Sequence, residues 1–216
     1  MLEQMDAFFD ARLQGYEEHQ LTCIEKADAF YPFTAHQLPA FPGVTILDLG
    51  CGTGLELSYY FPLAPEAKIT GIDLAPGMLS ALRKKFPDKA LNLIHGSYFD
   101  VPLSTEQFHA AVSVESLHHF TQEQKLPLYR KLHASLKDGG FFILTDYFAP
   151  DDAYEAFYQQ ELLRLKQEQG IADDAFYHYD TPLTVAHETQ TLLLAGFSRV
   201  EVLGSWGATH TLKAYR

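Results

Sequence analysis

The sequence predicts an α/β domain whose mostly parallel sheet is covered by helices on both faces. The first observation is that short apolar runs alternate with longer amphipathic segments, as in chains that wind a parallel sheet. The second is a glycine-rich turn that follows the first run and opens a helix. The runs predicted to be strands are 44–49, 68–73, 90–95, 108–114 and 139–146.

The strand at 44–49 is the best supported, because four of its six residues are apolar, as in a strand buried on both faces. Helices are expected near 54–61, 76–86 and 121–136. Thr121 and Gln124 fit a capping box at the start of the third helix. Gly139 and Gly140 are expected just past its end.

The two ends of the chain depart from simple alternation. Residues 2–38 are expected to form two helices, with Tyr31-Pro32 bending the second. Near the other end, a helix over 151–169 and a polar, aromatic loop over 170–180 precede Thr181-Pro182. Threonine as the N-cap and proline at the first helical position predict a helix from there to residue 195. Two strands, 198–205 and 209–215, are expected to close the chain as a hairpin.

Composition limits the partners. With 28 acidic and 16 basic residues the net charge is −12, which disfavours nucleic acid because phosphate binding needs clustered cations. The chain has 47% apolar residues but no run long enough to span a bilayer. Cys23 and Cys51 are far apart and indicate no disulfide framework, and the first residues lack a signal pattern. A cytoplasmic protein is therefore expected.

The glycine turn carries the functional signal. Gly50, Gly52 and Gly54 alternate after the first strand, so the backbone there is free to adopt positive φ and to approach a ligand closely. The carboxylate of Asp48 suits a cationic or hydroxyl-bearing ligand better than a pyrophosphate. Asp73 ends the next strand 25 residues later, where βαβ nucleotide folds place an acceptor for ribose hydroxyls.

A dehydrogenase-type dinucleotide fold is the alternative interpretation of this turn. Its fingerprint has two residues between the second and third glycines, whereas only Thr53 separates Gly52 from Gly54. The spacing therefore favours a different nucleotide-binding fold.

The stretches LDLGCGTG, over residues 47–54, and GIDLAPGML, over 71–79, resemble motifs I and II of the class I S-adenosylmethionine (SAM) dependent methyltransferases. Within that family the chain is similar to the UbiE-like, small-molecule group of methyltransferase domains, types 11, 12 and 25. The resemblance covers roughly residues 40–150. It implies a Rossmann-like seven-stranded sheet with a reversed C-terminal strand, SAM as cofactor, and methyl transfer to a small-molecule acceptor.

The resemblance also divides the expected single domain, 1–216, into parts. These are a helical cap (1–40), a cofactor-binding core (41–150), a substrate lid insertion (147–181) and a last helix with a strand hairpin (182–216). The lid stretch is rich in aromatic and acidic residues, which favours a neutral or amine-bearing acceptor.

By position in the family motifs, Asp48 or its loop receives the cofactor's ammonium group, and Ser97 replaces the aspartate that usually accepts from the adenine amine. The residues that the resemblance places around the cofactor are Tyr16, Asp48, Gly50, Cys51, Gly52, Gly54, Asp73, Leu74, Met78, Ser97, Tyr98, Ser113, Val114 and Glu115.

His118 and His119 follow the fourth strand and are the candidate catalytic bases, with His178 and His187 as weaker candidates. Neighbouring side chains on a helix diverge by about 100°, so the adjacent pair is not expected to share an ion, and no metal is predicted.

Two other functions stay open. Both ends of the chain loosely resemble the carboxy-SAM synthases, which modify SAM itself. A SAM-binding protein without catalysis is the third hypothesis. A homodimer is a further open expectation.

Overall fold

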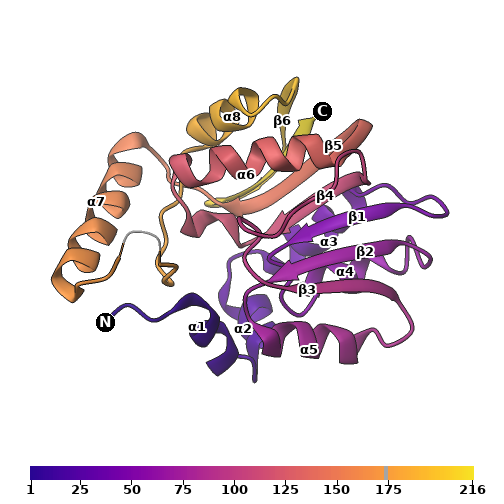
Figure 1. The fold of residues 1–216 in the computed structure, drawn as a ribbon, viewed down its shortest axis with the longest axis horizontal. Helices are drawn as coiled ribbons and strands as arrows, with labels where there is room; N and C mark the ends of the chain where they lie inside the picture. The colour runs from indigo at the N-terminus through magenta and orange to yellow at the C-terminus, as the bar shows by residue number, and fades with distance from the viewer. Residues whose placement is uncertain (173–174) are drawn as a thin grey trace.

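The computed structural model describes residues 1–172 and 175–216 and has one seven-stranded sheet in the order β3-β2-β1-β4-β5-β7-β6 (Figure 1). The first five strands in that order are parallel, and β7 runs antiparallel to both of its neighbours. The predicted sheet with its reversed C-terminal strand is therefore confirmed. The strands are β1 (Thr45–Leu49), β2 (Lys68–Asp73), β3 (Ala90–His95), β4 (Phe108–Val114), β5 (Leu136–Tyr147), β6 (Arg199–Trp206) and β7 (Thr209–Tyr215).

Helices cover both faces of the sheet, and each face has its own apolar core. One core joins the sheet to α3, α4 and α5, and the other joins it to α6 and α8. Side chains that alternate along β1 contribute to both cores. Ile46 packs in the first core, and Leu47 and Leu49 pack in the second. These helices are α3 (Ala27–Gln37), α4 (Leu55–Tyr60), α5 (Pro76–Lys85), α6 (Gln122–Ser135) and α8 (Val185–Leu194).

The N-terminal segment forms three helices, so the prediction of two is wrong. Gly15 and Lys26 have left-handed backbones, with φ of 83° and 60°, and each interrupts the helical hydrogen bonding. The first two helices are α1 (Met5–Ala11) and α2 (Tyr16–Cys23). Pro32 lies inside α3 and does not end it. In Figure 1, α1 and α2 lie beside α5, outside the two layers that cover the sheet.

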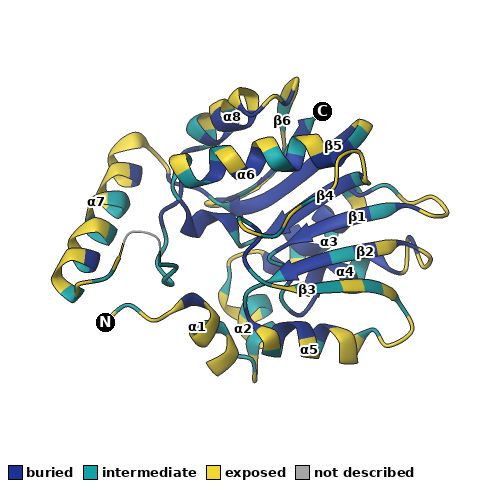
Figure 2. Ribbon diagram, viewed as in Figure 1, coloured by how far each residue is buried: buried dark blue, intermediate teal, exposed yellow. Residues whose placement is uncertain are grey.

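The helix α7 (Asp152–Gln169) begins where expected, because the Asp151 carboxylate accepts from the Tyr154 N–H at 2.8 Å as an N-cap. Figure 1 shows α7 standing apart from the other helices, and Figure 2 shows that most of its surface is exposed. Residues 173–174 of the loop expected after it lie outside the described residues.

The helix α8 starts three residues later than predicted. Its N-cap is Thr184, whose hydroxyl accepts from the His187 N–H at 3.2 Å. The Thr181 N–H donates instead to the His118 carbonyl at 2.7 Å, which keeps Thr181 in an extended segment. A tertiary hydrogen bond therefore overrides the local capping signal at Thr181-Pro182.

At α6 the capping box of Thr121 and Gln124 is confirmed. The predicted glycine C-cap is wrong, because the helix ends at Ser135 and Leu136 already pairs with Phe108 of β4. Gly139, at φ 73°, lies within the span of β5. Among the described helices, none is both long enough and apolar enough to cross a membrane.

A buried ion pair joins the two helices of the second core. Lys125 Nζ of α6 donates to Glu188 Oε2 of α8 at 2.6 Å, and both side chains are almost completely buried. The Tyr129 hydroxyl donates to the other carboxylate oxygen of Glu188. The pair therefore fixes the position of α8 on α6.

We expect Glu188→Gln to lower the free energy of unfolding by about 3–5 kcal/mol, because it leaves the Lys125 ammonium buried without its counter-charge. Urea unfolding followed by circular dichroism measures the change. The matched control is Glu161→Gln in the exposed pair with Arg164 on α7, which should cost less than about 1 kcal/mol. Equal losses in the two variants would contradict the prediction.

Candidate cofactor and acceptor site

The glycine loop after β1 uses its first two glycines in different ways. Gly50, Gly52 and Gly54 all have left-handed φ, of 71°, 48° and 68°. A Cβ on Gly50 would lie 2.1 Å from Ser116 Oγ, so this glycine allows the loop to pack on the end of β4. A Cβ on Gly52 would meet no atom within 4 Å, because this position faces a cavity. The loop therefore presents bare backbone to open space.

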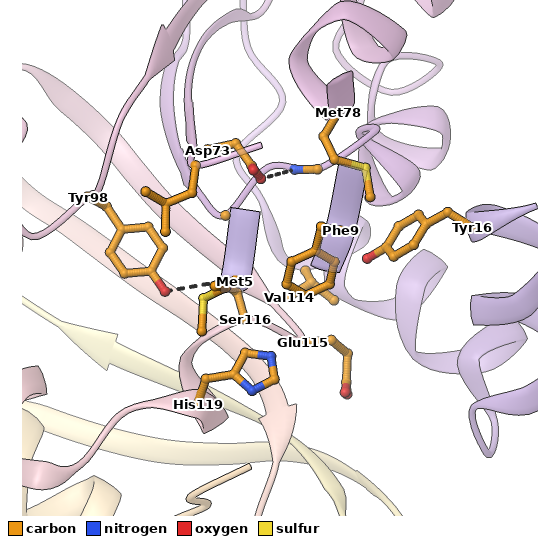
Figure 3. Close-up of a pocket in the computed structure, with 13 residues that line it drawn as sticks. Met5, Phe9, Tyr16, Asp73, Met78, Tyr98, Val114, Glu115, Ser116 and His119 are labelled. Atoms are coloured by element: carbon orange, nitrogen blue, oxygen red, sulfur yellow. Dashed lines mark hydrogen bonds between the residues drawn. The ribbon is translucent and has the colours of Figure 1, made fainter. Parts of the chain in front are cut away.

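Asp73 is the best-positioned acceptor at this loop. Its two carboxylate oxygens accept from the N–H groups of Gly52 and Ala75, each at 2.8 Å. Burial raises the pKa of Asp73 above its ordinary value, although these two hydrogen bonds oppose the shift. Each oxygen keeps a second lone pair, and the carboxylate lies in the cavity wall (Figure 3). A ribose diol is the kind of group that could donate to it.

Most of the predicted cofactor residues line this cavity, which has a volume of about 50 Å³. From the glycine loop, β2 and α5 they are Gly50, Gly52, Asp73, Leu74 and Met78. From elsewhere they are Tyr16, Tyr98, Val114 and Glu115, with the candidate base His119 beside them.

Three further residues of the wall, Met5, Phe9 and Ser116, were not predicted from the sequence (Figure 3). Met5 and Phe9 come from α1 and cover the strand ends. In the sequence, Met5 and Phe9 show only that a short helix has apolar residues, and this does not reveal where the helix packs. A SAM molecule needs more than 50 Å³, so it would have to extend into the adjoining cavity or displace α1.

Three predicted residues, Cys51, Gly54 and Ser113, are absent from the wall because they face protein atoms elsewhere. Cys51 is buried against Gly71 of β2, where an added Cβ would lie 2.7 Å from its Sγ. Gly54 lies against Leu82 of α5, since a Cβ there would lie 2.4 Å from Leu82 Cδ1. The hydroxyl of Ser113 donates to the Leu49 carbonyl at 2.9 Å.

Ser97 and Asp48 are also absent from the wall. Ser97 Oγ accepts from the Phe99 N–H at 3.1 Å, so it caps its own turn and does not face the cavity. Asp48 is buried beneath the glycine loop, 1% exposed. A direct contact between its carboxylate and the cofactor's ammonium therefore finds no support in this arrangement.

Asp48 pairs with Glu56, the second residue of α4. Neither Asp48 Oδ2 nor Glu56 Oε1 accepts a hydrogen bond from a donor among the described residues. The two buried carboxyl groups face each other instead, and a hydrogen bond between them requires a proton on one of the two. Burial and the neighbouring Glu56 charge raise the pKa of Asp48 well above its ordinary value, and burial also raises that of Glu56. The pair therefore keeps a proton to higher pH than an ordinary carboxyl group would.

Glu115 lies at the boundary between this cavity and a larger one. It is a non-glycine residue with a left-handed φ of 49°, a strained conformation of the kind often found at active sites. Its N–H donates to the Thr145 carbonyl at 2.9 Å, and its carboxylate accepts from the Thr209 hydroxyl at 3.2 Å. Burial and the nearby Asp146 charge raise the pKa of Glu115 to about 7.

The larger cavity, about 830 Å³, has the size of a small-molecule site. It shares Phe9, Tyr16, Glu115 and His119 with the smaller cavity. Its wall joins α1 and α2 to the strand ends and to the segment before α8. The N-terminus closes on that segment through an isolated antiparallel bridge between Gln4 and Tyr177.

His118 lies on a short 3₁₀ turn, η1 (Leu117–His119), in the wall of the larger cavity. Its Nδ1 donates to Asp146 Oδ1 at 2.5 Å, and Asp146 Oδ2 accepts from the Leu117 N–H at 2.8 Å. Burial alone would lower the pKa of His118, but the Asp146 carboxylate raises it to about 9. His118 is therefore protonated at neutral pH in the arrangement described here.

His119 differs in charge and lies in the wall of both cavities. Burial and the neighbouring His118 charge lower the pKa of His119 to about 4, so its ring is neutral at pH 7. The two rings lie 4.0 Å apart, and both approach the carboxylate of Asp180. The expectation that the two side chains diverge is wrong, because both rings turn toward the same Asp180 carboxylate from their positions on the η1 turn.

The carboxylates beside the histidines, Asp146 and Asp180, were also missed. Asp146 lies close to the end of β5, on the edge of the sheet where Asp73 ends β2, so the same strand-end argument could have found it. Asp180 had no signal in the sequence. Of the weaker base candidates, His178 lines the larger cavity, whereas His187 lies outside both walls and bonds Glu155 at 2.9 Å.

Comparison with known proteins identifies the family. Residues 46–140 match the family model of a methyltransferase domain. This chain belongs to the class I SAM-dependent methyltransferases. A demethylmenaquinone methyltransferase of Chlorobaculum parvum is 31% identical over 168 residues, which cover 72% of this chain and 66% of that protein. The methyltransferase sheet of human N-acetylserotonin methyltransferase, solved with SAM, superposes with a TM-score of 0.68 at 19% identity, over 98% of this chain and 56% of that one.

A second relative bears on the alternative function. A carboxy-S-adenosyl-L-methionine synthase of Campylobacter fetus is 23% identical to this chain, over 81% of the chain and 78% of that protein. Other curated relatives are much longer, since the chain spans 30% of one and 50% of another.

The proton shared by Asp48 and Glu56 makes stability depend on pH. Above the ordinary carboxyl pKa the unfolded chain releases a proton that the folded chain still keeps on this pair. The free energy of unfolding therefore falls as the pH rises from the unfolded-state pKa to the folded-state pKa, by up to about 1.4 kcal/mol per pH unit for one group. In Asp48→Asn the amide donates to Glu56 without a titrating proton. We expect the variant to gain stability relative to the wild type as the pH rises above about 4, the ordinary pKa of a carboxyl group in the unfolded chain.

Urea unfolding at several pH values tests this. Asp88→Asn, at an exposed position, is the control and should follow the wild type. Parallel pH profiles for Asp48→Asn and the wild type would refute the shared proton.

Proposed function

We propose that this chain transfers a methyl group from SAM to a small-molecule acceptor that binds in the larger cavity. One observation carries the proposal. The cavity at the glycine loop and the larger cavity share a wall of four residues, Phe9, Tyr16, Glu115 and His119. Because the two cavities adjoin at these residues, a ligand in one would lie next to a ligand in the other.

The residues at the glycine loop fit the cofactor. The Asp73 carboxylate has lone pairs free for a ribose diol, and the space beside Gly52 would be filled by any Cβ. The side chains of Leu74, Met78 and Tyr98 offer flat or apolar contact for a base. When bound, SAM supplies an electrophilic methyl group on a sulfonium.

The chain's own contribution is positioning and the exclusion of water. Displacement at a methyl carbon gains most from proximity and alignment and needs little proton transfer. Met5 and Phe9 of α1 and Tyr16 of α2 cover the strand ends, so the reacting atoms would be shielded from solvent. The Glu115 carboxyl group at the boundary would favour a cationic centre near it. The base role expected for His118 or His119 stays a prediction.

The larger cavity favours an acceptor with an aromatic or apolar body. Phe8, Phe9, Tyr147 and Trp206 contribute rings to its wall, and Asp180 and Glu25 add negative charge. A neutral or amine-bearing small molecule fits these surfaces better than a phosphate polymer, in keeping with the net charge of −12.

A carboxy-SAM-synthase-like activity is the second candidate. It is favoured by the relative of that name, because the match covers 78% of that protein and so includes more than the cofactor-binding core. The two candidates differ in product, since one releases S-adenosylhomocysteine and the other a modified SAM.

Asp73→Asn tests the cofactor site. Losing a charged hydrogen-bond acceptor costs about 1.5–3 kcal/mol, so calorimetry should show SAM binding weakened about 10- to 150-fold. Asp88→Asn, at an exposed position, is the charge-matched control and should bind as the wild type does. A wild-type chain that binds neither SAM nor S-adenosylhomocysteine would refute the cofactor assignment.

Mass spectrometry of the nucleoside product tests the reaction. We expect S-adenosylhomocysteine to accumulate when the wild type is incubated with SAM and a panel of aromatic amines and phenols. A carboxylated SAM would instead establish the second candidate. Tight SAM binding with unchanged SAM across the panel would support the hypothesis of a binding protein without catalysis and contradict methyl transfer.

A further inference from the structure

The larger cavity brings together three side chains that commonly ligate metals. His118 Nε2 and His119 Nδ1 lie 3.6 Å and 3.2 Å from the same oxygen, Asp180 Oδ1. All three ligand atoms lie within 4.8 Å of one another. The residues come from two segments, the η1 turn after β4 and the stretch before α8, so only the tertiary fold assembles them.

The spacing of these atoms is that of a metal's ligands. Zinc binds imidazole nitrogen and carboxylate oxygen at about 2.0–2.2 Å, so two ligands in a tetrahedral arrangement lie about 3.4 Å apart. The observed separations of 3.6 and 3.2 Å lie on either side of that value. An ion between the three groups would therefore need only small side-chain adjustments.

Hydrogen bonds outside the cluster hold its members in place. The Asp146 carboxylate accepts from His118 Nδ1 at 2.5 Å, which leaves Nε2 of the same ring directed at Asp180. A carboxylate behind a ligating histidine is the usual second-shell arrangement of zinc sites. The Thr181 N–H donates to the His118 carbonyl at 2.7 Å and so anchors Asp180 next to the turn.

We propose that His118, His119 and Asp180 bind a divalent transition-metal ion of the zinc type in the acceptor cavity. Two histidines and one carboxylate leave coordination positions open for a ligand from solution. The charges also suit a dication, because Asp180 and Asp146 would offset it, and the ion would displace the proton that His118 otherwise holds.

The role of the ion rests on the proposed function. An acceptor hydroxyl or thiol bound at an open position would lose its proton more readily and would be oriented toward the neighbouring cavity. The two histidines then act as ligands and not as bases. Oxygen or sulfur acceptors would accordingly be preferred to amines that cannot ionise in this way.

Metal binding is tested without cofactor or acceptor. After chelator treatment, the full chain is titrated with Co²⁺, followed by its visible d–d absorption, and then with Zn²⁺ as a competitor. We expect one Co²⁺ per chain, displaced by Zn²⁺. Asp180→Asn and His119→Gln should each weaken Co²⁺ binding by more than roughly 10-fold, the loss typical of removing a group that only hydrogen-bonds a metal ligand.

The matched control is His187→Gln, which removes a histidine bonded to Glu155 at 2.9 Å, outside the cavity. Its Co²⁺ affinity should equal that of the wild type. Asp180 has a side chain 42% exposed, so Asp180→Asn should fold normally, which circular dichroism checks. Absence of a Co²⁺ band in the wild type, or equal affinity in Asp180→Asn, would overturn the proposal. SAM calorimetry on the same samples separates this failure from failure of the proposed function.

Discussion

The parallel pairing of β2, β1, β4 and β5 is the constraint on which this site depends. Because parallel strands end at the same edge of a sheet, their carboxyl termini bring Asp73, Glu115 and Asp146 to one rim. The order β3-β2-β1-β4 reverses the direction of winding at β1, so the rim opens there into a crevice. The two adjoining cavities occupy this crevice, and every candidate role discussed above uses it.

Gathering carboxyl groups at a buried rim has an electrostatic cost, which the protein offsets differently for each group. Asp73 accepts two backbone N–H groups, and Asp146 pairs with His118. Asp48 shares a proton with Glu56. Glu115 accepts from one threonine hydroxyl, has a pKa of about 7 and stands between the two cavities. A cationic or polar ligand could supply a further hydrogen-bond donor or a positive charge to the Glu115 carboxyl group.

Two segments distant in sequence enclose the rim. The N-terminal residues and the stretch before α8 pair with each other, since the Met5 N–H donates to the Phe176 carbonyl and the His178 N–H to the Glu3 carbonyl. This pairing places Met5 and Phe9 in the wall of the smaller cavity and Asp180 in the wall of the larger one. Neither segment belongs to the sheet, but Met5 of one and Phe176 of the other pack against its apolar core.

The sequence by itself determined the positions of the core strands, the glycine turn and the Asp73 acceptor, because these depend on local periodicity, backbone freedom and strand-end position. It also found Glu115 and the adjacent histidines. Only the tertiary structure decided that Thr181 bonds His118 instead of capping α8, that Asp48 faces Glu56, and that Asp180 joins the histidines. Asp48 and Glu56 face each other across the glycine turn, and the other two outcomes depend on contacts between segments far apart in the sequence, such as Thr181 and His118, which no local pattern encodes.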